Sequence, residues 1–516
     1  MIRQDRRLSM LVFVLAVGVV VSLFAWDGHK GFELSDEGFL WYGAQRVFHG
    51  EVPIRDFMAY DPGRYYWSAA FMGLRGDTGI MSVRVAAAAF EAMGLFVGLW
   101  LIARAAGPMG GGNILYLLLS AATLAVWMTP YYKTFDTTLS ILLIGTLAFL
   151  IHSPGVRSYF LAGVCLGVVA VFGRNHGVYG IAGSLGAMLW LQLKRAGGPG
   201  LAKGFTLWTA GIAVGFAPVL LMALLVPGFA GAFWESIRFL FEIRATNITV
   251  PVPWPWRVNF AALPAGFAVP AVLVGVFFIA VLAFGASSVA WVVWQKLRNR
   301  PVPPVLAAAA FLAFPYAHYA YSRADVVHIA LGIFPLLLGC LAVLAAQPAG
   351  IKWPLSLMLC AASLWTLHQR HPGWQCRDGQ ACVDVEISGS SLKMDPSAAS
   401  EVGMFRNLVQ RYAADGRSFL AVPYFPGAYA LFERRSPTWE IYPLVPRSPE
   451  FEQAEIERVK KAGPAFVLES DWPLDRRDEM RFRYTHPLIH RYILDKFDPL
   501  PPLLDPVDRA YQAKPP

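Results

Sequence analysis

The sequence predicts a mainly α-helical, polytopic membrane protein with about eleven spans and a small C-terminal α/β domain. Of the 516 residues, 56% are hydrophobic and only 15% are charged, and the mean hydropathy is +0.45. Soluble domains usually carry roughly 25% charged residues. The apolar residues form blocks of the length that crosses a bilayer, about 20 residues, with all backbone hydrogen bonds made inside the helix. These blocks end near residue 367.

The first apolar block follows Arg3, Arg6 and Arg7 and ends at Trp26. A signal peptide begins in a similar way, but no small-residue cleavage site follows this block. We therefore predict an uncleaved first span. Ten further spans are expected at residues 80–103, 113–130, 137–152, 159–173, 178–193, 204–226, 264–294, 304–320, 326–345 and 353–367.

The loops between these spans differ in charge. Segments on the side of the N-terminus carry one acid, Asp5, against twelve bases: Arg3, Arg6, Arg7, Arg104, Arg157, Lys194, Arg195, Lys203, Lys296, Arg298, Arg300 and Lys352. Basic loops stay in the cytoplasm, so the N-terminus is predicted inside. We divide the chain into a transmembrane domain, residues 1–367, with an outer loop at 27–79, and an extracytoplasmic domain, residues 368–516. Because the bases are scattered between apolar blocks, the net charge of +9 does not indicate nucleic-acid binding.

The C-terminal region has the pattern of a small α/β domain. An amphipathic stretch at 399–416 precedes a strand-like run at 419–424, and the same order recurs at 450–463 and 465–470. Cys376 and Cys382 lie close together around an Asp-Gly turn. We predict a disulfide between them, since an extracytoplasmic compartment is oxidising; two free surface thiols are the alternative.

The first outer loop contains two stretches typical of amphipathic helices, one at 37–50 and one after Pro62. Such helices lie along the membrane surface. Asp36 and Glu37 form an acidic pair at the start of the first helix, where a carboxylate can cap the helix and also face a site. Asp56 and Asp61 are weaker candidates, and Asp61 before Pro62 is typical of a helix cap.

The short outer loops carry charges that a simple connection between spans does not need. They include Lys133, Arg174 with His176, and Arg323 with Asp325 and His328. Charges beside spans are costly near lipid and tend to face one another or a cavity. Arg and Lys in such places can bind phosphate, whereas an ordinary ion pair such as Arg323–Asp325 is the alternative.

Three segments of the chain resemble a known family. They are SDEGFLWYGAQRVFHGEVPIRDFMAYDPGRYYW at 35–67, YSRADVVH at 321–328 and FRYTHPLIHRYILDKF at 482–497. Together with the N-in first span and the C-terminal outer domain, they resemble the C-type, or GT-C, membrane glycosyltransferases. Within these, the resemblance is to bacterial relatives of the protein mannosyltransferases and aminoarabinose transferases.

The resemblance implies inverting transfer of a sugar from a polyprenyl-phosphate donor at the outer face of the bacterial cytoplasmic membrane. The acceptor would be a glycan, a lipid or a protein. Asp36 would act as the general base and Glu37 as a positioning group, although the two roles could be exchanged. The donor phosphate would be bound by Arg64, Lys133, Arg174 and Arg323, with Asp56, Asp61, His176, Asp325 and His328 as other site candidates. No cofactor is expected; a divalent metal is compatible, but no ligand spacing indicates one.

Two other functions remain open. A lipid-linked glycan polymerase or ligase would use similar donors. A transporter would place ionisable residues at mid-membrane depth. Glu91 lies well inside a predicted span, and Arg84 is a candidate to pair with it.

Overall fold

The computed structural model describes residues 2–108, 110–193, 198–244, 246–376 and 382–514. The predicted inner bases Lys194 and Arg195 lie outside these ranges. The chain divides into two compact units, which we describe separately. The helical unit comprises Met1–Trp26 and Ala87–Trp374, and the α/β unit comprises Asp27–Ala86 and Gln375–Pro516.

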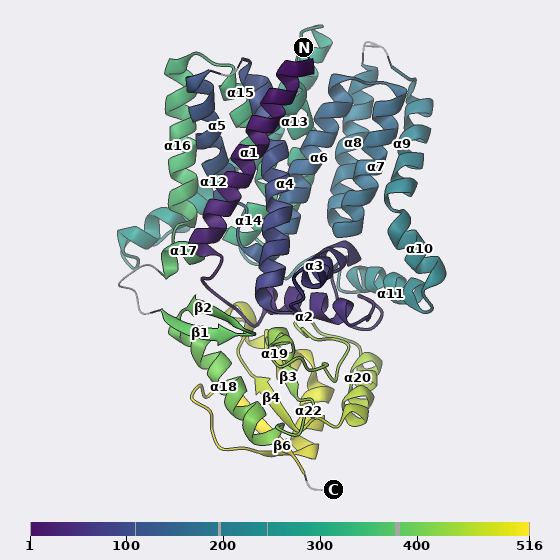
Figure 1. The fold of residues 1–516 in the computed structure, drawn as a ribbon, viewed down its shortest axis with the longest axis vertical. Helices are drawn as coiled ribbons and strands as arrows, with labels where there is room; N and C mark the ends of the chain where they lie inside the picture. Colours follow the sequence, from purple (N-terminus) through teal and green to yellow (C-terminus); the bar gives the residue numbers. More distant parts are fainter. Residues whose placement is uncertain (1, 109, 194–197, 245, 377–381, 515–516) are drawn as a thin grey trace. The chain divides into compact units, whose positions relative to one another are not determined.

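Long helices dominate the helical unit (Figure 1). Each of the eleven predicted blocks coincides with one helix or with a broken pair of helices. In chain order they are α1 (Ile2–Asp27), α4 (Ile80–Ala106), α5 (Gly111–Val126), α6 (Thr134–His152), α7 (Val156–Phe172), α8 (Arg174–Gln192), α9 (Leu201–Gly215) with α10 (Ala217–Leu225), α12 (Ala265–Leu297), α13 (Pro304–Ser322), α14 (Val326–Gly332) with α15 (Phe334–Ala345), and α16 (Ala349–Leu367). Shorter elements are η1 (Tyr131–Lys133), α11 (Phe229–Glu242), η2 (Pro255–Arg257) and α17 (Pro372–Gln375).

Two of the predicted spans are bent. The α9–α10 pair bends by 56° and the α14–α15 pair by 53°. Pro218 and Pro335 lie in the first turn after each break, where a proline fits without breaking a hydrogen bond but cannot continue a preceding helix. By length and composition, four of the described helices could cross a membrane alone, or six if each bent pair counts as one span. The count of eleven therefore stays a prediction.

Glycines allow α7 and α9 to pack closely. Gly163 and Gly167 on α7 face Gly211 and Gly215 on α9, both with GxxxG spacing. A Cβ added at Gly163 would lie 2.1 Å from the carbonyl oxygen of Trp208, and one at Gly215 would lie 2.1 Å from that of Val164. Small residues at this spacing let membrane helices approach until their backbones touch.

The α/β unit contains two sheets. Strands β1 (Val383–Ile387) and β2 (Ser390–Met394) form an antiparallel hairpin whose turn has positive φ at Ser388 and Gly389. The larger sheet has the order β3-β4-β6-β5, in which β3 (Leu420–Val422) and β4 (Phe466–Ser470) are parallel. Strand β6 (Asp508–Ala513) is antiparallel to both β4 and β5 (Phe497–Pro499).

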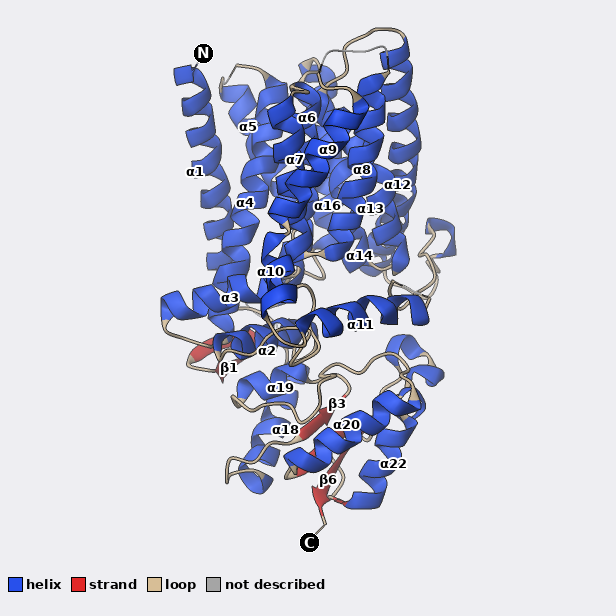
Figure 2. Cartoon of the chain, turned by 90° about the vertical axis from the view of Figure 1, so that its right-hand side faces the viewer, coloured by secondary structure: helices blue, strands red, loops and turns tan. Residues whose placement is uncertain are grey.

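Helices cover both faces of the larger sheet (Figure 2). The helices of the α/β unit are α2 (Asp36–Phe48), α3 (Pro62–Arg75), α18 (Pro396–Tyr412), α19 (Pro426–Leu431), α20 (Pro449–Ala462), α21 (Phe482–Thr485) and α22 (Pro487–Lys496), with short turns η3 (Leu474–Arg476) and η4 (Asp478–Met480). One face buries Val467 of β4 against Val459 of α20 and Ile493 of α22. On the other face, Phe419 stacks between Phe466 and Tyr429. The predicted order of helix then strand, found twice, is confirmed by α18–β3 and α20–β4.

The compact units differ from the predicted domain division in two respects, since residues 368–374 belong to the helical unit and the first outer loop does not. The first outer loop belongs to the same unit as the C-terminal region. Hydrogen bonds explain this: the Tyr42 hydroxyl accepts from the backbone N–H of Ser436, and the indole of Trp439 donates to the carbonyl of Ile54. Helices α2 and α19 touch where Gly38 meets Gly427. Residues nearly 400 positions apart create this interface, so loop length and polarity alone could not predict it.

Candidate functional site

Asp36 is the first residue of α2 and follows Ser35, the N-cap residue. A helix N-terminus favours a carboxylate because the helix dipole is positive there. Asp36 is half-buried. Burial, and then the charges of Asp36 and Glu33, raise the pKa of Tyr442 well above its usual range. Tyr442 therefore lies within electrostatic reach of both Asp36 and Glu33, and Ser35, Asp36 and Tyr442 are polar groups at this helix start.

Glu37 has a different environment from Asp36. Its two carboxylate oxygens accept from the Nε and Nη2 atoms of Arg84 at 2.7 and 2.9 Å, and both side chains are buried. Arg84 also donates to the carbonyls of Gly28 and Gly31. Glu37 is thus held in a fork-to-fork ion pair that anchors the chain before α2. Arg84 thus pairs with Glu37, and the pairing with Glu91 that the sequence suggested stays a prediction.

The other candidates in the first outer loop are held by local contacts. Asp56 accepts from the Nε and Nη2 atoms of Arg55 at 2.8 and 2.7 Å and from the Val52 N–H. Burial acts to raise the pKa of Asp56, but these hydrogen bonds outweigh it and hold the pKa below its ordinary value. Asp61 is buried at the N-cap position of α3. Arg64 is also buried, with its guanidinium 5.0 Å from the centre of the Tyr60 ring.

A buried polar network joins α6, α8 and α13 in the helical unit. His176 donates from Nε2 to Asp136 at 3.0 Å, and its Nδ1 is hydrogen-bonded to the Tyr316 hydroxyl at 2.7 Å. The Tyr319 hydroxyl also donates to Asp136 at 3.2 Å. We call Asp136, His176, Tyr316 and Tyr319 the Tyr319 network.

A second group of predicted residues meets this network at Tyr319. The His328 ring lies 6.3 Å from the Tyr319 ring, edge-on. His328 donates from Nδ1 to Asp325 at 2.9 Å, and its Nε2 lies 2.7 Å from the side-chain nitrogen of Asn247. Burial acts to raise the pKa of Asp325, but hydrogen bonds and charge from His328, together with the charge of Arg323, lower it to about 2.

The structure shows a contact for each predicted phosphate ligand of the helical unit. Arg323 donates to Asp325 at 2.8 Å and to the carbonyl of Ile248, so the ion pair considered as an alternative does form. Arg174, the first residue of α8, donates to the Ser236 hydroxyl at 2.7 Å. Its guanidinium also lies 4.9 Å from the Phe233 ring of α11. Lys133 packs over the ring of Tyr132.

The structure therefore brings His176 and His328 to the Tyr319 ring, and Asp325, which contacts His328, also binds Arg323. Sequence reasoning missed Tyr316, Tyr319, Asn247 and Tyr442, because tyrosine and asparagine in apolar or loop segments resemble ordinary packing residues. The two tyrosines do follow a detectable pattern, since they lie three positions apart on one face of α13. Among the described residues, no group of three or more His, Cys, Asp or Glu side chains is arranged to hold a metal ion.

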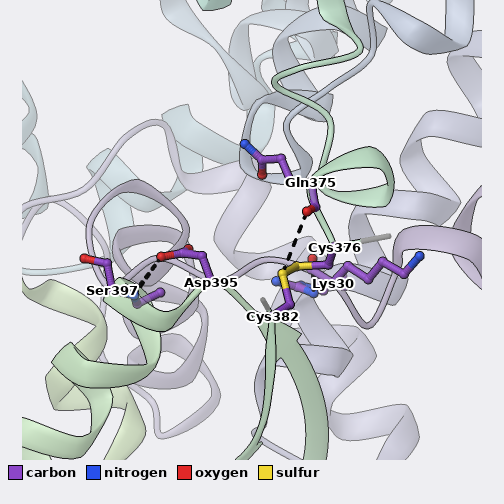
Figure 3. Close-up of a disulfide and its surroundings, with 8 residues drawn as sticks. Lys30, Gln375, Cys376, Cys382, Asp395 and Ser397 are labelled. Atoms are coloured by element: carbon purple, nitrogen blue, oxygen red, sulfur yellow. Dashed lines mark hydrogen bonds between the residues drawn. A yellow bond between two sulfur atoms is a disulfide. The ribbon is translucent and has the colours of Figure 1, made fainter. Parts of the chain in front are cut away.

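Cys376 and Cys382 form a disulfide in the α/β unit (Figure 3). Their Cα atoms are 5.5 Å apart, a separation typical of disulfides. The intervening residues 377–381 lie outside the described part of the chain. The bridge lies just before β1 and is separate in sequence from every candidate catalytic residue.

Comparison with solved structures shows which known fold the chain has. No protein-family model matches the chain, and no curated protein matches its sequence. Among solved structures, it is similar to ArnT from Cupriavidus metallidurans bound to undecaprenyl phosphate, with a TM-score of 0.55, 14% identity, and coverage of 98% of this chain and 99% of that one. An oligosaccharyltransferase from Archaeoglobus fulgidus, solved with Zn and sulfate, gives a TM-score of 0.46 at 14% identity, covering 89% and 68%.

ArnT is an aminoarabinose transferase, and both proteins are GT-C glycosyltransferases. At 14% identity the likeness to ArnT shows the fold. The resemblance named from the sequence is therefore confirmed at the level of the fold. This chain is a mainly helical, multi-pass membrane protein with a small sheet-containing region.

Proposed function

We propose that this chain is an inverting glycosyltransferase that takes a sugar from a polyprenyl-phosphate donor at the outer face of the bacterial inner membrane. The observation that carries the proposal is the fold shared along nearly its whole length with ArnT, a structure that contains undecaprenyl phosphate. The acidic pair at the start of α2 supports it from the sequence. The C-terminal region lies outside the cytoplasm in this proposal, as the charge of the loops predicts.

Asp36 is the general base of the proposed reaction. An acceptor hydroxyl attacks the anomeric carbon, its proton passes to the Asp36 carboxylate, and polyprenyl phosphate leaves with the electron pair of the broken C–O bond. A positioned base contributes roughly 10²- to 10⁴-fold to such a step. Asp36 suits this role better than Glu37, because Arg84 already occupies both oxygens of Glu37.

Glu37 and Arg84 are positioning residues in this scheme. Glu37 follows Asp36 directly, so the ion pair with Arg84 fixes the first turn of α2 on which Asp36 lies. Arg84 ties the same turn to the carbonyls of residues 28 and 31. The orientation of Asp36 therefore depends on a buried contact that takes no part in proton transfer.

Cations stabilise the leaving phosphate in the proposed reaction. Arg64, Lys133 and Arg174 are the candidates that we retain for this role, because fixed cations stabilise the negative charge that develops on a leaving group. Arg323 is a weaker candidate than the sequence suggested, since Asp325 already neutralises its charge. Inversion requires the base and the phosphate-binding cations on opposite faces of the sugar, and the sequence places Asp36 in one outer loop and Lys133 and Arg174 in others.

The proposal is tested with purified protein and a panel of polyprenyl-phosphate sugars. We expect one donor to release polyprenyl phosphate faster when an acceptor is present, and the product linkage to have the opposite anomeric configuration. Arg174→Ala should raise the donor KM or lower turnover, whereas Arg238→Ala, which removes an exposed arginine of α11 paired with Glu235 and Glu242, should change neither. Retained configuration, or no release with any donor, would contradict the proposal.

A further inference from the structure

The Tyr319 network lies at the starts of two helices of the helical unit. Asp136 is in the first turn of α6, three residues after Lys133, which is the N-cap residue of that helix. His176 is in the first turn of α8, two residues after Arg174, with which α8 begins. Lys133 and Arg174 are candidate phosphate ligands of the proposed reaction. The network therefore adjoins two of the proposed cations along the chain.

A direct contact joins these two helix starts. The Nε2 atom of His176 donates to Oδ1 of Asp136 at 3.0 Å, and both side chains are buried. The chain folds tightly around the imidazole, because a Cβ added at Gly173, the N-cap residue of α8, would lie 2.8 Å from its Cδ2 atom. The glycine therefore lets the His176 ring lie against the backbone that directly precedes Arg174.

Helix α13 holds this contact from a third side. The Tyr319 hydroxyl donates to the same oxygen of Asp136 at 3.2 Å, and the Tyr316 hydroxyl is hydrogen-bonded to Nδ1 of His176 at 2.7 Å. The rings of the two tyrosines lie 5.5 and 5.6 Å from the His176 ring. Helices α6, α8 and α13 also pack against one another in pairs. Four buried side chains thus fix the relative position of three helices.

The place of the network in its helices favours a positioning role. Apolar side chains of similar volume often hold helices together as well as a buried ionisable pair does, or better, so packing alone does not require one. Ionisable groups in a proton pathway lie along the spans at membrane depth. Asp136 and His176 instead lie within the first turn of their helices. Directional hydrogen bonds at this place suit fixing the geometry of the helix starts.

A binding site for a phosphate group depends on such a fixed geometry. Cations that are already in place stabilise a developing negative charge without the cost of reorganisation. The guanidinium of Arg174 contacts the Ser236 hydroxyl and the Phe233 ring of α11. The backbone of Arg174 is fixed by His176, two positions later in the same helical turn. Both ends of this side chain are therefore held.

We propose that the Tyr319 network positions Lys133 and Arg174 for the phosphate of the donor. Asp136 and His176 are then positioning residues, because their contact sets the distance between the starts of α6 and α8. The two tyrosines hold that contact to α13. This inference rests on the proposed function, since the phosphate is that of the polyprenyl-phosphate donor, and it extends the site to residues that do not touch the donor.

The test measures binding of undecaprenyl phosphate to the full chain in lipid nanodiscs, without sugar or acceptor. His176→Leu removes both hydrogen bonds, whereas His176→Gln keeps a side-chain N–H that can donate to Asp136. We expect the leucine variant to bind roughly tenfold or more weakly, since a hydrogen bond to a charged group contributes about this much, and the glutamine variant to regain most of the affinity. His318→Leu is the matched control, because His318 bonds to Tyr179 on the same face of the bundle; it should bind as the wild type does.

A double variant distinguishes positioning from a general loss of structure. If His176 acts through Arg174, the two replacements share one effect, so His176→Leu combined with Arg174→Ala should weaken binding by less than the product of the single effects. A replacement that only lowers the stability of the fold acts independently of Arg174, and its effect multiplies with that of Arg174→Ala. Affinities are compared per folded molecule, with the unfolding temperature of each variant measured alongside.

The outcomes separate this inference from the proposed function. If the wild type binds undecaprenyl phosphate and His176→Leu binds equally tightly, or if the effects in the double variant multiply, the positioning role is refuted and the proposed function stands. No binding by the wild type would contradict the donor site and the positioning role together. If His176→Leu does not fold, Tyr319→Phe replaces it, because it removes only the hydroxyl that donates to Asp136. Tyr319→Phe should weaken binding roughly threefold or more, and wild-type affinity in this variant would refute the role.

Discussion

Asp36 and Glu37 are adjacent in the chain, but their surroundings separate their roles. Glu37 is buried in a bidentate pair with Arg84, whereas Asp36 is half-buried at the helix start near Tyr442. The sequence indicates the pair as a unit, since both residues suit the first turn of a helix. It could not divide the roles between them, because Arg84 lies 47 positions away and its partner depends on tertiary packing.

Because Glu37 is held in an ion pair, replacing it should lower the stability of the fold. Replacing Asp36 should not. Removing one partner of a buried pair leaves the other charge unpaired and costs on the order of 3–5 kcal/mol. We expect Glu37→Gln to lower the thermal unfolding temperature of the purified protein by several degrees. The matched control is Glu235→Gln, which removes an exposed pair with Arg238 and should cost roughly 0–1 kcal/mol.

Measuring both turnover and unfolding temperature distinguishes a structural role of Glu37 from a catalytic one. A Glu37→Gln protein that unfolds at the wild-type temperature and yet has lost transfer would show that Glu37 acts in the reaction. We expect the reverse: lower stability, with residual turnover in the fraction that remains folded.

The pKa of Glu401, on α18, predicts that the stability of the α/β unit depends on pH. Burial, and then the charges of Asp508, Asp395 and Asp505, raise the pKa of Glu401 from 4.5 to about 7. Between these values the folded chain retains a proton that the unfolded chain releases, so this group makes stability fall as the pH rises from 4.5 to 7. Glu401→Gln should reduce the fall in unfolding temperature between pH 5 and pH 8. An unchanged pH profile in the variant would contradict this assignment.

Among the elements, the α7–α9 contact depends on four glycines. Gly211 packs against the carbonyl of Phe160, which would lie 2.2 Å from an added Cβ. We expect Gly211→Val to separate the helices and to lower the unfolding temperature markedly. Gly112→Ala at the start of α5 is the control, because an added Cβ there meets nothing within 4 Å. Equal stability of the two variants would show that the close approach is not needed.

Helix positions could be predicted far better than helix partners. All eleven apolar blocks are helical, since a continuous apolar run has few other ways to satisfy its backbone. The breaks at Phe216 and Ile333 were not predicted, although the prolines after them were visible. The joining of α2 with α19 was also missed, because Gly38 and Gly427 carry no side chain that marks a contact.

At the scale of the whole molecule, the asymmetry of charge between loops predicts the orientation. A periplasmic reporter fused after Leu367 should be active, and a cytoplasmic reporter fused at Gly198 should be active. The reason is that twelve bases on one side hold those loops in the cytoplasm. Reversed activities would place Asp36 on the cytoplasmic side, where the proposed donor site would not be available to it.

The fold along the whole chain could be recognised from the sequence, whereas the site could be recognised only in part. The acidic pair and the motif around Arg323 pointed to polar regions that the structure contains. Tyr316, Tyr319 and Asn247 could not be predicted, because hydrogen bonds between segments far apart in the sequence define their roles.

The most direct test of the account is single-turnover transfer by Asp36→Asn protein. Asparagine keeps the shape of the side chain and cannot accept the proton, so we expect the rate to fall by roughly 10²-fold or more, with the unfolding temperature and donor binding unchanged. Asp56→Asn, at an acid already paired with Arg55, should retain the wild-type rate within about threefold, since a non-catalytic acid loses no transition-state contact. Wild-type turnover in well-folded Asp36→Asn protein would contradict the mechanism.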